Sequence, residues 1–228
     1  MRKFDLTLYL VTDSTGMTEN DFLRIVRESC EGGVTIVQLR EKERSGKEYL
    51  ELAEKVKDVT DAYEIPLIID DRADIAVAAD AAGVHVGRSD ISVRAARKVL
   101  GKNRIIGASA KTTAQAQQAL DEGADYLGVG AIYPTTTKVV TVITPVTVLN
   151  DIAALTGLPT VAIGGLNAGN IHVLYGSRAN GIAVVSAIMK SADPRSTAAS
   201  LKEQVVSNFI SVPYAPKGKG GATPRELR

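Results

Sequence analysis

The sequence has few of the residues on which several classes of protein depend. It has no tryptophan and only 4% aromatic residues, which argues against the base-stacking surfaces that bind single-stranded nucleic acid. Its single cysteine, Cys30, cannot form an internal disulfide, and no Cys/His pattern suits zinc. A reducing cytoplasm is the expected location. The 27 basic and 26 acidic residues give a net charge of +1, so no overall field attracts nucleic acid or a membrane surface.

Long uninterrupted apolar segments are also missing. The longest stretch without a charged residue, 152–177, is broken by Pro159 and five glycines, so it does not fit a membrane-spanning helix. The N-terminus reaches Asp5 before any apolar region, unlike a secretory signal. We therefore expect no membrane association.

What the sequence does contain is a regular series of short apolar runs. With 45% hydrophobic residues in 228, the chain can bury a sizeable core in one large domain, which we place at 1–211. The runs recur about every 25 residues, enough for a strand, a helix and two loops. They begin near residues 7, 34, 66, 83, 104, 125, 159 and 181.

Amphipathic stretches separate these runs. In residues 47–63, apolar side chains recur at helical spacing, and Gly33, Gly83, Gly123 and Gly157 stand where helices are expected to end. Eight alternating units predict an α/β fold, a (β/α)8 TIM barrel, rather than an open sheet. The glycine- and lysine-rich segment 212–228 is predicted to be a flexible tail.

The active site of a TIM barrel lies at the carboxyl ends of its strands, so polar residues there are the candidates. After the second run, Gln38, Arg40 and Lys42 alternate with Leu39 and Glu41 and so share one direction. Two cations and an amide would line the mouth. The alternative is a rim ion pair between these cations and a neighbouring glutamate.

Carboxylates follow the third and fourth runs. Asp70 and Asp71 end one, and Asp90 follows the other. Carboxylates at adjacent strand ends can share a cation, and Mg²⁺ is usually held by one or two of them plus substrate phosphates. The alternative is that Asp71 and Asp90 cap the helices that follow.

The remaining strand ends carry neutral polar groups and glycine. Ser109 follows the fifth run, and residues 133–138 after the sixth, YPTTTK, combine three hydroxyls with one ammonium, a set suited to an oxyanion. Gly164–Gly165 and Val185–Ser186 end the last two runs, where these barrels commonly bind phosphate. His85, within a strand, and His172 are interpreted as structural.

These residues resemble the thiamine phosphate synthase family over about residues 7–190. The resemblance rests on seven motifs in order: QLREK at 38–42, DDR at 70–72, GxxD at 87–90, GAS at 107–109, GVGAIYPTTTK at 128–138, AIGGLN at 162–167 and AVVSAI at 183–188. It implies a TIM barrel enzyme that joins hydroxymethylpyrimidine diphosphate to hydroxyethylthiazole phosphate and releases pyrophosphate with Mg²⁺.

The same resemblance implies roles for individual residues. Pyrimidine contacts are expected from Gln38 and Ser109, diphosphate contacts from Arg40, Lys42 and Lys138, and metal ligation from Asp71 and Asp90. Asp70 is also expected at the substrate. The thiazole phosphate region is expected to include Thr135, Thr137, Gly165, Val185 and Ser186. The catalytic set is expected to be Arg40, Ser109 and Lys138.

Three positions depart from the family pattern. Asp70 stands where Asn is frequent, and Arg88, where Gln is frequent, is a candidate to compensate its charge. Lys111 replaces a histidine that the related thiazole tautomerase also uses, which counts against that activity. Two alternatives stay open: a sugar-phosphate isomerase or epimerase, which would need a general base at the mouth, and a non-catalytic thiamine-phosphate-binding barrel. A homo-oligomer is also left open.

Overall fold

Eight parallel strands form a closed ring, paired in the order β1 to β8 with β8 returning to β1. The computed structural model describes residues 4–135 and 142–209. The strands are β1 (Leu8–Val11), β2 (Ile36–Leu39), β3 (Leu67–Asp70), β4 (Gly83–Val86), β5 (Ile105–Ala110), β6 (Tyr126–Gly130), β7 (Thr160–Ile163) and β8 (Gly181–Val184). The eight predicted runs and the TIM barrel are thus confirmed.

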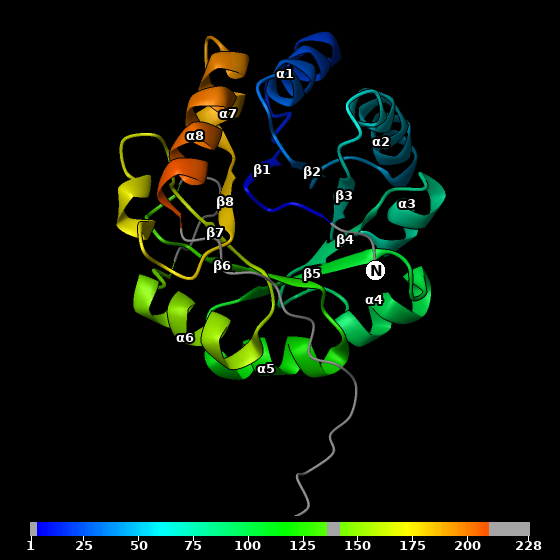
Figure 1. Ribbon diagram of the computed structural model, residues 1–228. Helices are drawn as coiled ribbons and strands as arrows, with labels where there is room; N and C mark the ends of the chain where they lie inside the picture. Colours follow the sequence, from blue (N-terminus) through cyan, green and yellow to red (C-terminus); the bar gives the residue numbers. More distant parts are fainter. Residues whose placement is uncertain (1–3, 136–141, 210–228) are drawn as a thin grey trace, which may run out of the picture.

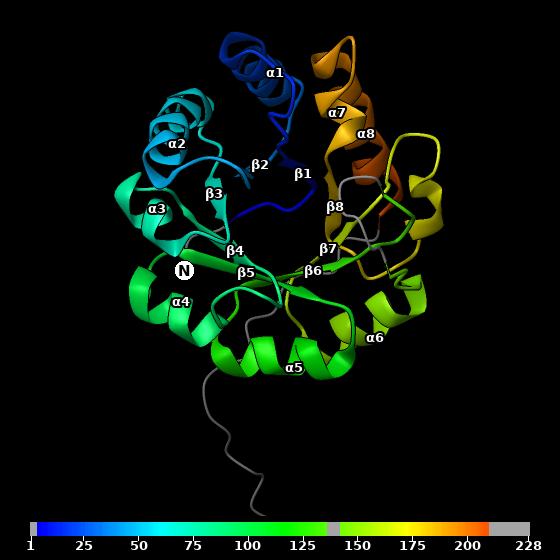
Figure 2. The same cartoon turned by 180° about the vertical axis from the view of Figure 1, so that it is seen from behind.

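Helices surround this ring in chain order (Figures 1 and 2). They are α1 (Glu19–Glu31), α2 (Gly46–Asp61), α3 (Ala73–Ala78), α4 (Val93–Leu100), α5 (Thr113–Glu122), α6 (Val146–Thr156), the 3-10 helix η1 (Ile171–Leu174), α7 (Ser186–Met189) and α8 (Pro194–Asn208). Within the described ranges, every helix is too short or too polar to cross a bilayer. The predicted tail 212–228 lies outside those ranges.

Local sequence signals explain where the helices begin and end. Ser45 and Glu48 form a capping box that starts α2, and left-handed Gly123 and Gly157 end α5 and α6 as predicted. The same prediction is wrong for Gly83, which is the first residue of β4. A Cβ atom there would come within 1.9 Å of the Ile105 carbonyl oxygen. The missing side chain at Gly83 leaves room for the neighbouring strand.

Two layers of apolar side chains hold the barrel together. One lies between the strands and the helices and includes Leu10, Val26 and Leu52. The other fills the inside of the ring and includes Tyr9 and Tyr126. Alternate strand residues therefore face opposite layers, and the side chains that face inward near the strand ends lead into the mouth of the barrel.

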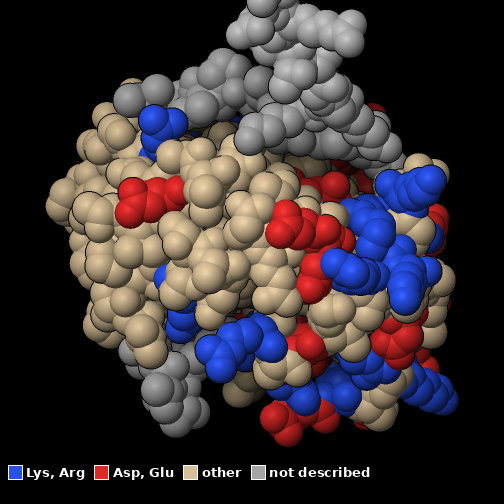
Figure 3. Space-filling view, turned by 90° about the horizontal axis from the view of Figure 1, so that it is seen from below, with Lys and Arg blue, Asp and Glu red and all other residues tan. Residues whose placement is uncertain are grey.

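Charged side chains are unevenly distributed over the outside. The view of Figure 3 shows basic and acidic residues gathered on the side of α4, and a largely uncharged surface on the side of α6. This agrees with the sequence, since α4 carries Arg94, Arg97 and Lys98, whereas α6 carries only Asp151.

Candidate active site

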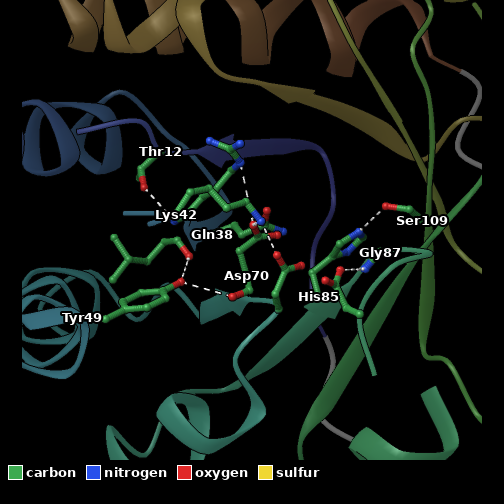
Figure 4. Close-up of polar contacts among 12 residues, drawn as sticks. Thr12, Gln38, Lys42, Tyr49, Asp70, His85, Gly87 and Ser109 are labelled. Atoms are coloured by element: carbon green, nitrogen blue, oxygen red, sulfur yellow. Dashed lines mark hydrogen bonds and ion pairs between the residues drawn. The ribbon is translucent and has the colours of Figure 1, made fainter. Parts of the chain in front are cut away.

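The three polar residues at the end of β2 point toward the barrel mouth, as predicted. Gln38 is buried inside the ring. The Lys42 ammonium lies 2.9 Å from Oδ2 of Asp70 and also contacts Asp71, and Nε of Arg40 lies 3.8 Å from the same Asp70 oxygen. Figure 4 shows Gln38, Lys42 and Asp70 converging. Both cations therefore face the carboxylates of β3.

The alternative of a rim ion pair with a neighbouring glutamate is wrong for these cations. Glu41 turns away from them: one carboxylate oxygen accepts from Ser14 at 2.9 Å and from Arg44 at 3.0 Å. Glu41 points to the opposite face from Arg40 and Lys42 and accepts from Ser14 in the loop after β1. The side chains of Arg40 and Lys42 therefore remain directed at the barrel mouth.

A tyrosine on the neighbouring helix fixes the two strand ends that carry these charges. The Tyr49 hydroxyl donates to the carbonyl oxygen of Leu39 at 2.7 Å and approaches that of Asp70 at 3.3 Å (Figure 4). Burial raises the pKa of Tyr49 far above its usual value, so the group remains a donor. The relative position of the β2 and β3 ends is thus held from outside the ring.

Asp70 is a largely buried carboxylate in this cluster. Burial raises its pKa, and the charge of Asp71 raises it further, while Lys42 and Arg40 oppose the shift. Among the described residues, the ion pairs of Asp70 are with Lys42 and Arg40. Arg88 does not provide the compensating charge that the sequence suggested.

Asp71 and Asp90, the predicted metal ligands, lie side by side. Oδ2 of Asp90 accepts the Gly87 N–H at 2.8 Å, and each of the two carboxyl groups influences the pKa of the other. Burial raises the pKa of both groups. Asp71 raises the pKa of Asp90 further, whereas Asp90 and Lys42 outweigh burial at Asp71 and hold its pKa below the ordinary value.

Neither aspartate caps a helix, so that alternative is wrong. The residue before α3 is Arg72, with no side-chain cap, and the cap of α4 is Ser92, whose hydroxyl accepts from the Ala95 N–H at 3.1 Å. Asp71 has a left-handed backbone, with φ of 59°, which turns its side chain out of the helical path. Both carboxylates are therefore available at the mouth.

The donor set fits a hard divalent cation that also binds phosphate. Two adjacent carboxylates are the usual protein share of a Mg²⁺ site, the rest being water and substrate oxygens. Within residues 4–135 and 142–209, no cluster of three or more His, Cys, Asp or Glu side chains could hold a metal by itself. Asp71 and Asp90 are the residues that would hold Mg²⁺.

Ser109 faces the mouth from β5, as predicted, and is exposed. Its hydroxyl lies 2.9 Å from Nε2 of His85 on β4 (Figure 4). The sequence did not predict that His85 contacts a candidate site residue: its Nδ1 lies 3.0 Å from the Tyr126 hydroxyl, so the ring joins Ser109 to Tyr126. Strand alternation is the signal that could have indicated this contact: His85 stands two residues before Gly87, the residue directly after β4, and faces the inside of the ring.

The predicted phosphate region lies at the ends of β6, β7 and β8. Gly165 has a left-handed backbone with φ of 64°, and a Cβ atom there would come within 2.5 Å of the Pro134 carbonyl oxygen. The loops after β6 and β7 therefore pack closely only because this residue is glycine. Val185 and Ser186 join β8 to α7. Thr135 ends the first described range, and Thr137 and Lys138 lie outside both ranges.

Comparison with known proteins gives concordant matches. The family model described as thiamine monophosphate synthase matches residues 8–188. A thiamine-phosphate synthase of Enterococcus faecalis is 52% identical over 81% of this chain and 87% of its own, and one of Methanobrevibacter smithii is 45% identical over 90% and 97%. A thiamine phosphate pyrophosphorylase structure from Pyrococcus furiosus superposes with a TM-score of 0.81 at 35% identity, over 89% of this chain and 96% of that one.

Proposed function

Because the chain belongs to the thiamine monophosphate synthase family of thiamine-biosynthesis enzymes, we propose that it joins hydroxymethylpyrimidine diphosphate to hydroxyethylthiazole phosphate. The bond between the pyrimidine methylene carbon and the diphosphate oxygen breaks, and its electron pair leaves with pyrophosphate. A bond then forms between that carbon and the thiazole nitrogen. The products are thiamine phosphate and pyrophosphate.

The observation that carries this proposal is the cluster of opposite charges at the ends of β2, β3 and β4. Arg40 and Lys42 contact Asp70, and Lys42 also contacts Asp71, which pairs with Asp90. A departing diphosphate needs cations at its oxygens as negative charge develops. This cluster provides two cations, and Lys138 in the loop after β6 is proposed as a third.

The reaction needs little proton transfer if the diphosphate departs before the thiazole attacks. The pyrimidine methylene cation left behind is stabilised by resonance, so the site has to align the two rings and stabilise the leaving charge. Gln38 and Ser109 are proposed to hold the pyrimidine. Mg²⁺, when held by Asp71 and Asp90, supplies further neutralisation of the diphosphate.

The thiazole phosphate is assigned to the other side of the mouth. Gly165, Val185 and Ser186 lie at the ends of β7 and β8, the position where these barrels commonly bind a monophosphate through backbone N–H groups. Thr135 and Thr137 are proposed to complete the region from the β6 loop. The two phosphate-bearing substrates would thus approach each other across one opening.

A direct assay tests the proposal. Purified protein is mixed with the two precursors and Mg²⁺, and thiamine phosphate is detected by oxidation to a fluorescent thiochrome. Product that needs both precursors, with one pyrophosphate released for each, is the expected result. Binding of thiamine phosphate without turnover would instead favour a binding protein. Isomerisation of a sugar phosphate, with no response to pyrophosphate, would favour the other alternative.

A further inference from the structure

A continuous line of hydrogen bonds crosses the inside of the barrel between the two residues proposed to hold the pyrimidine. Nε2 of Gln38 donates to the Tyr9 hydroxyl at 2.8 Å, which lies 2.8 Å from the hydroxyl of Tyr126. The Tyr126 hydroxyl lies 3.0 Å from Nδ1 of His85, whose Nε2 is 2.9 Å from Ser109. The line links β2, β1, β6, β4 and β5.

The surroundings of this line are built to hold it. Gln38, Tyr9 and Tyr126 are 5%, 1% and 0% exposed. Two neighbouring strand positions are glycine, and both open space for the imidazole. A Cβ atom at Gly107 would lie 2.5 Å from Nδ1 of His85 and 2.3 Å from the Tyr126 hydroxyl, and one at Gly128 would lie 3.2 Å from the imidazole Cε1. Any larger residue at position 107 would displace the ring or the phenol.

The chemistry of the groups allows these bonds to be ordered in one direction. The amide nitrogen of Gln38 can only donate, so the Tyr9 oxygen accepts from it and its one proton remains for Tyr126. The Tyr126 hydroxyl then has its own proton for Nδ1 of His85. Burial raises the pKa of both tyrosines, so each keeps the single proton that this order requires.

We propose that the line runs one way, from Gln38 to Ser109, so that Nδ1 of His85 accepts from Tyr126 and the imidazole carries its proton on Nε2. His85 donates that proton to Ser109, and the serine hydroxyl is left to donate to the substrate. Gln38, Tyr9, Tyr126 and His85 thereby act together as positioning residues that set Ser109 as a donor. The Ser109 hydroxyl, held as a donor in this way, suits an acceptor nitrogen of a heteroaromatic ring.

This proposal rests on the proposed function only for the identity of the substrate ring that accepts from Ser109. The order of protons within the line belongs to the ligand-free protein and can be measured there. A failed synthase assay would therefore leave the tautomer result standing, and a wrong tautomer would leave the synthase activity standing.

The tautomer can be read from the ring nitrogens by NMR. The chain has two histidines, His85 and His172, so a ¹⁵N-histidine-labelled sample gives two sets of long-range proton–nitrogen signals, and a His172→Gln sample assigns them. The expected pattern for His85 is an unprotonated Nδ1 and a protonated Nε2. A proton on Nδ1, a doubly protonated ring or an averaged mixture of tautomers would each overturn the proposal.

Two variants test whether the line causes that state. Tyr126→Phe keeps the ring but removes the donor to Nδ1, so the His85 signals should move toward a mixture of tautomers. Tyr49→Phe is the matched control, since it also removes a buried hydroxyl but one that bonds backbone carbonyl oxygens outside the line. An unchanged tautomer in Tyr126→Phe, in a sample whose circular dichroism matches the native protein, would overturn the role of the line.

A variant that reverses the direction of the hydrogen bonds tests whether Gln38 sets that direction. In Gln38→Glu the carboxylate can only accept, so Tyr9 must turn its proton toward it, Tyr126 must donate to Tyr9, and the His85 proton should move to Nδ1. A proton that stays on Nε2 would contradict Gln38 as the group that sets the direction. In the synthase assay, Tyr126→Phe should raise the KM for the pyrimidine diphosphate about fivefold, the effect of one hydrogen bond, and leave the affinity for pyrophosphate unchanged.

Discussion

Lys42 and Asp70 form an ion pair across two adjacent strand ends, with Nζ of the lysine 2.9 Å from Oδ2 of the aspartate. In the free protein this pair neutralises a cation that the proposed reaction assigns to the diphosphate. The same carboxylate is close to Arg40. In the free protein the cations of the site are therefore paired with carboxylates of β3 and the residue after it. A bound diphosphate would compete for the cations, and Mg²⁺ would compete for the carboxylates.

We expect Asp90→Ala to lower kcat by at least about tenfold with the fold intact, the effect of losing a contact that acts in the transition state. The reason is that Asp90 is half of the proposed Mg²⁺ carboxylate pair. Steady-state kinetics of the thiochrome assay measures the change. Asp121→Ala, on the outer surface of α5 where the carboxylate accepts from the Gln117 side chain at 2.9 Å, is the control. Near-native turnover in Asp90→Ala would refute this role.

Lys138→Ala should likewise lower kcat by at least about tenfold, because one of the proposed cations at the leaving group is lost. The matched control is Lys47→Ala, whose side chain is 85% exposed on α2. Both variants are compared at saturating concentrations of the two precursors. If Lys138→Ala and Lys47→Ala were equally active, the loop after β6 would have no part in stabilising the departing diphosphate.

Pyrophosphate is expected to bind more tightly in the presence of Mg²⁺. The Asp71 and Asp90 carboxylates repel a diphosphate unless a cation lies between them and its oxygens. Isothermal titration calorimetry with Mg²⁺ and with a chelator compares the two affinities. The difference should disappear in Asp90→Ala. Equal affinities in the native protein under both conditions would count against the metal site.

Gly107→Ala should destabilise the barrel by about 1 to 3 kcal/mol, the usual cost of overpacking a core. A Cβ atom at this position would lie 2.1 Å from Cζ of Tyr126. Urea unfolding at equilibrium measures the loss. Gly46→Ala, in the first turn of α2 where the nearest atom would be the Arg72 guanidinium at 3.4 Å, is the control and should be as stable as the native protein. Equal stabilities of the two variants would contradict the tight packing at Gly107.

Cys30 should not react with thiol reagents in the folded protein. It is 5% exposed on α1, and burial together with the neighbouring Glu31 raises its pKa to about 12. The reactive thiolate is therefore scarce at pH 8. Ellman's reagent should give no rapid colour until urea unfolds the chain, after which one thiol per chain reacts. Rapid labelling of the native protein would show that α1 opens readily.

Much of this protein follows from the sequence because the signals are local and repeated. Eight apolar runs at steady spacing specify a closed parallel barrel, and the alternation of side chains along β2 places Gln38, Arg40 and Lys42 on one face before any contact is known. The strand-end position of Asp71 and Asp90 follows in the same way. Motif order then connects these residues with one family.

Only the tertiary structure decided which side chains meet. Lys42 pairs with Asp70 instead of a nearby glutamate because β2 and β3 are neighbours in the ring, and their register is a long-range property. His85 joins Tyr126 and Ser109 across three strands because Gly107 and Gly128 leave its ring room inside the barrel. Periodicity reports which face a residue occupies, whereas its partners depend on how distant strands close the ring.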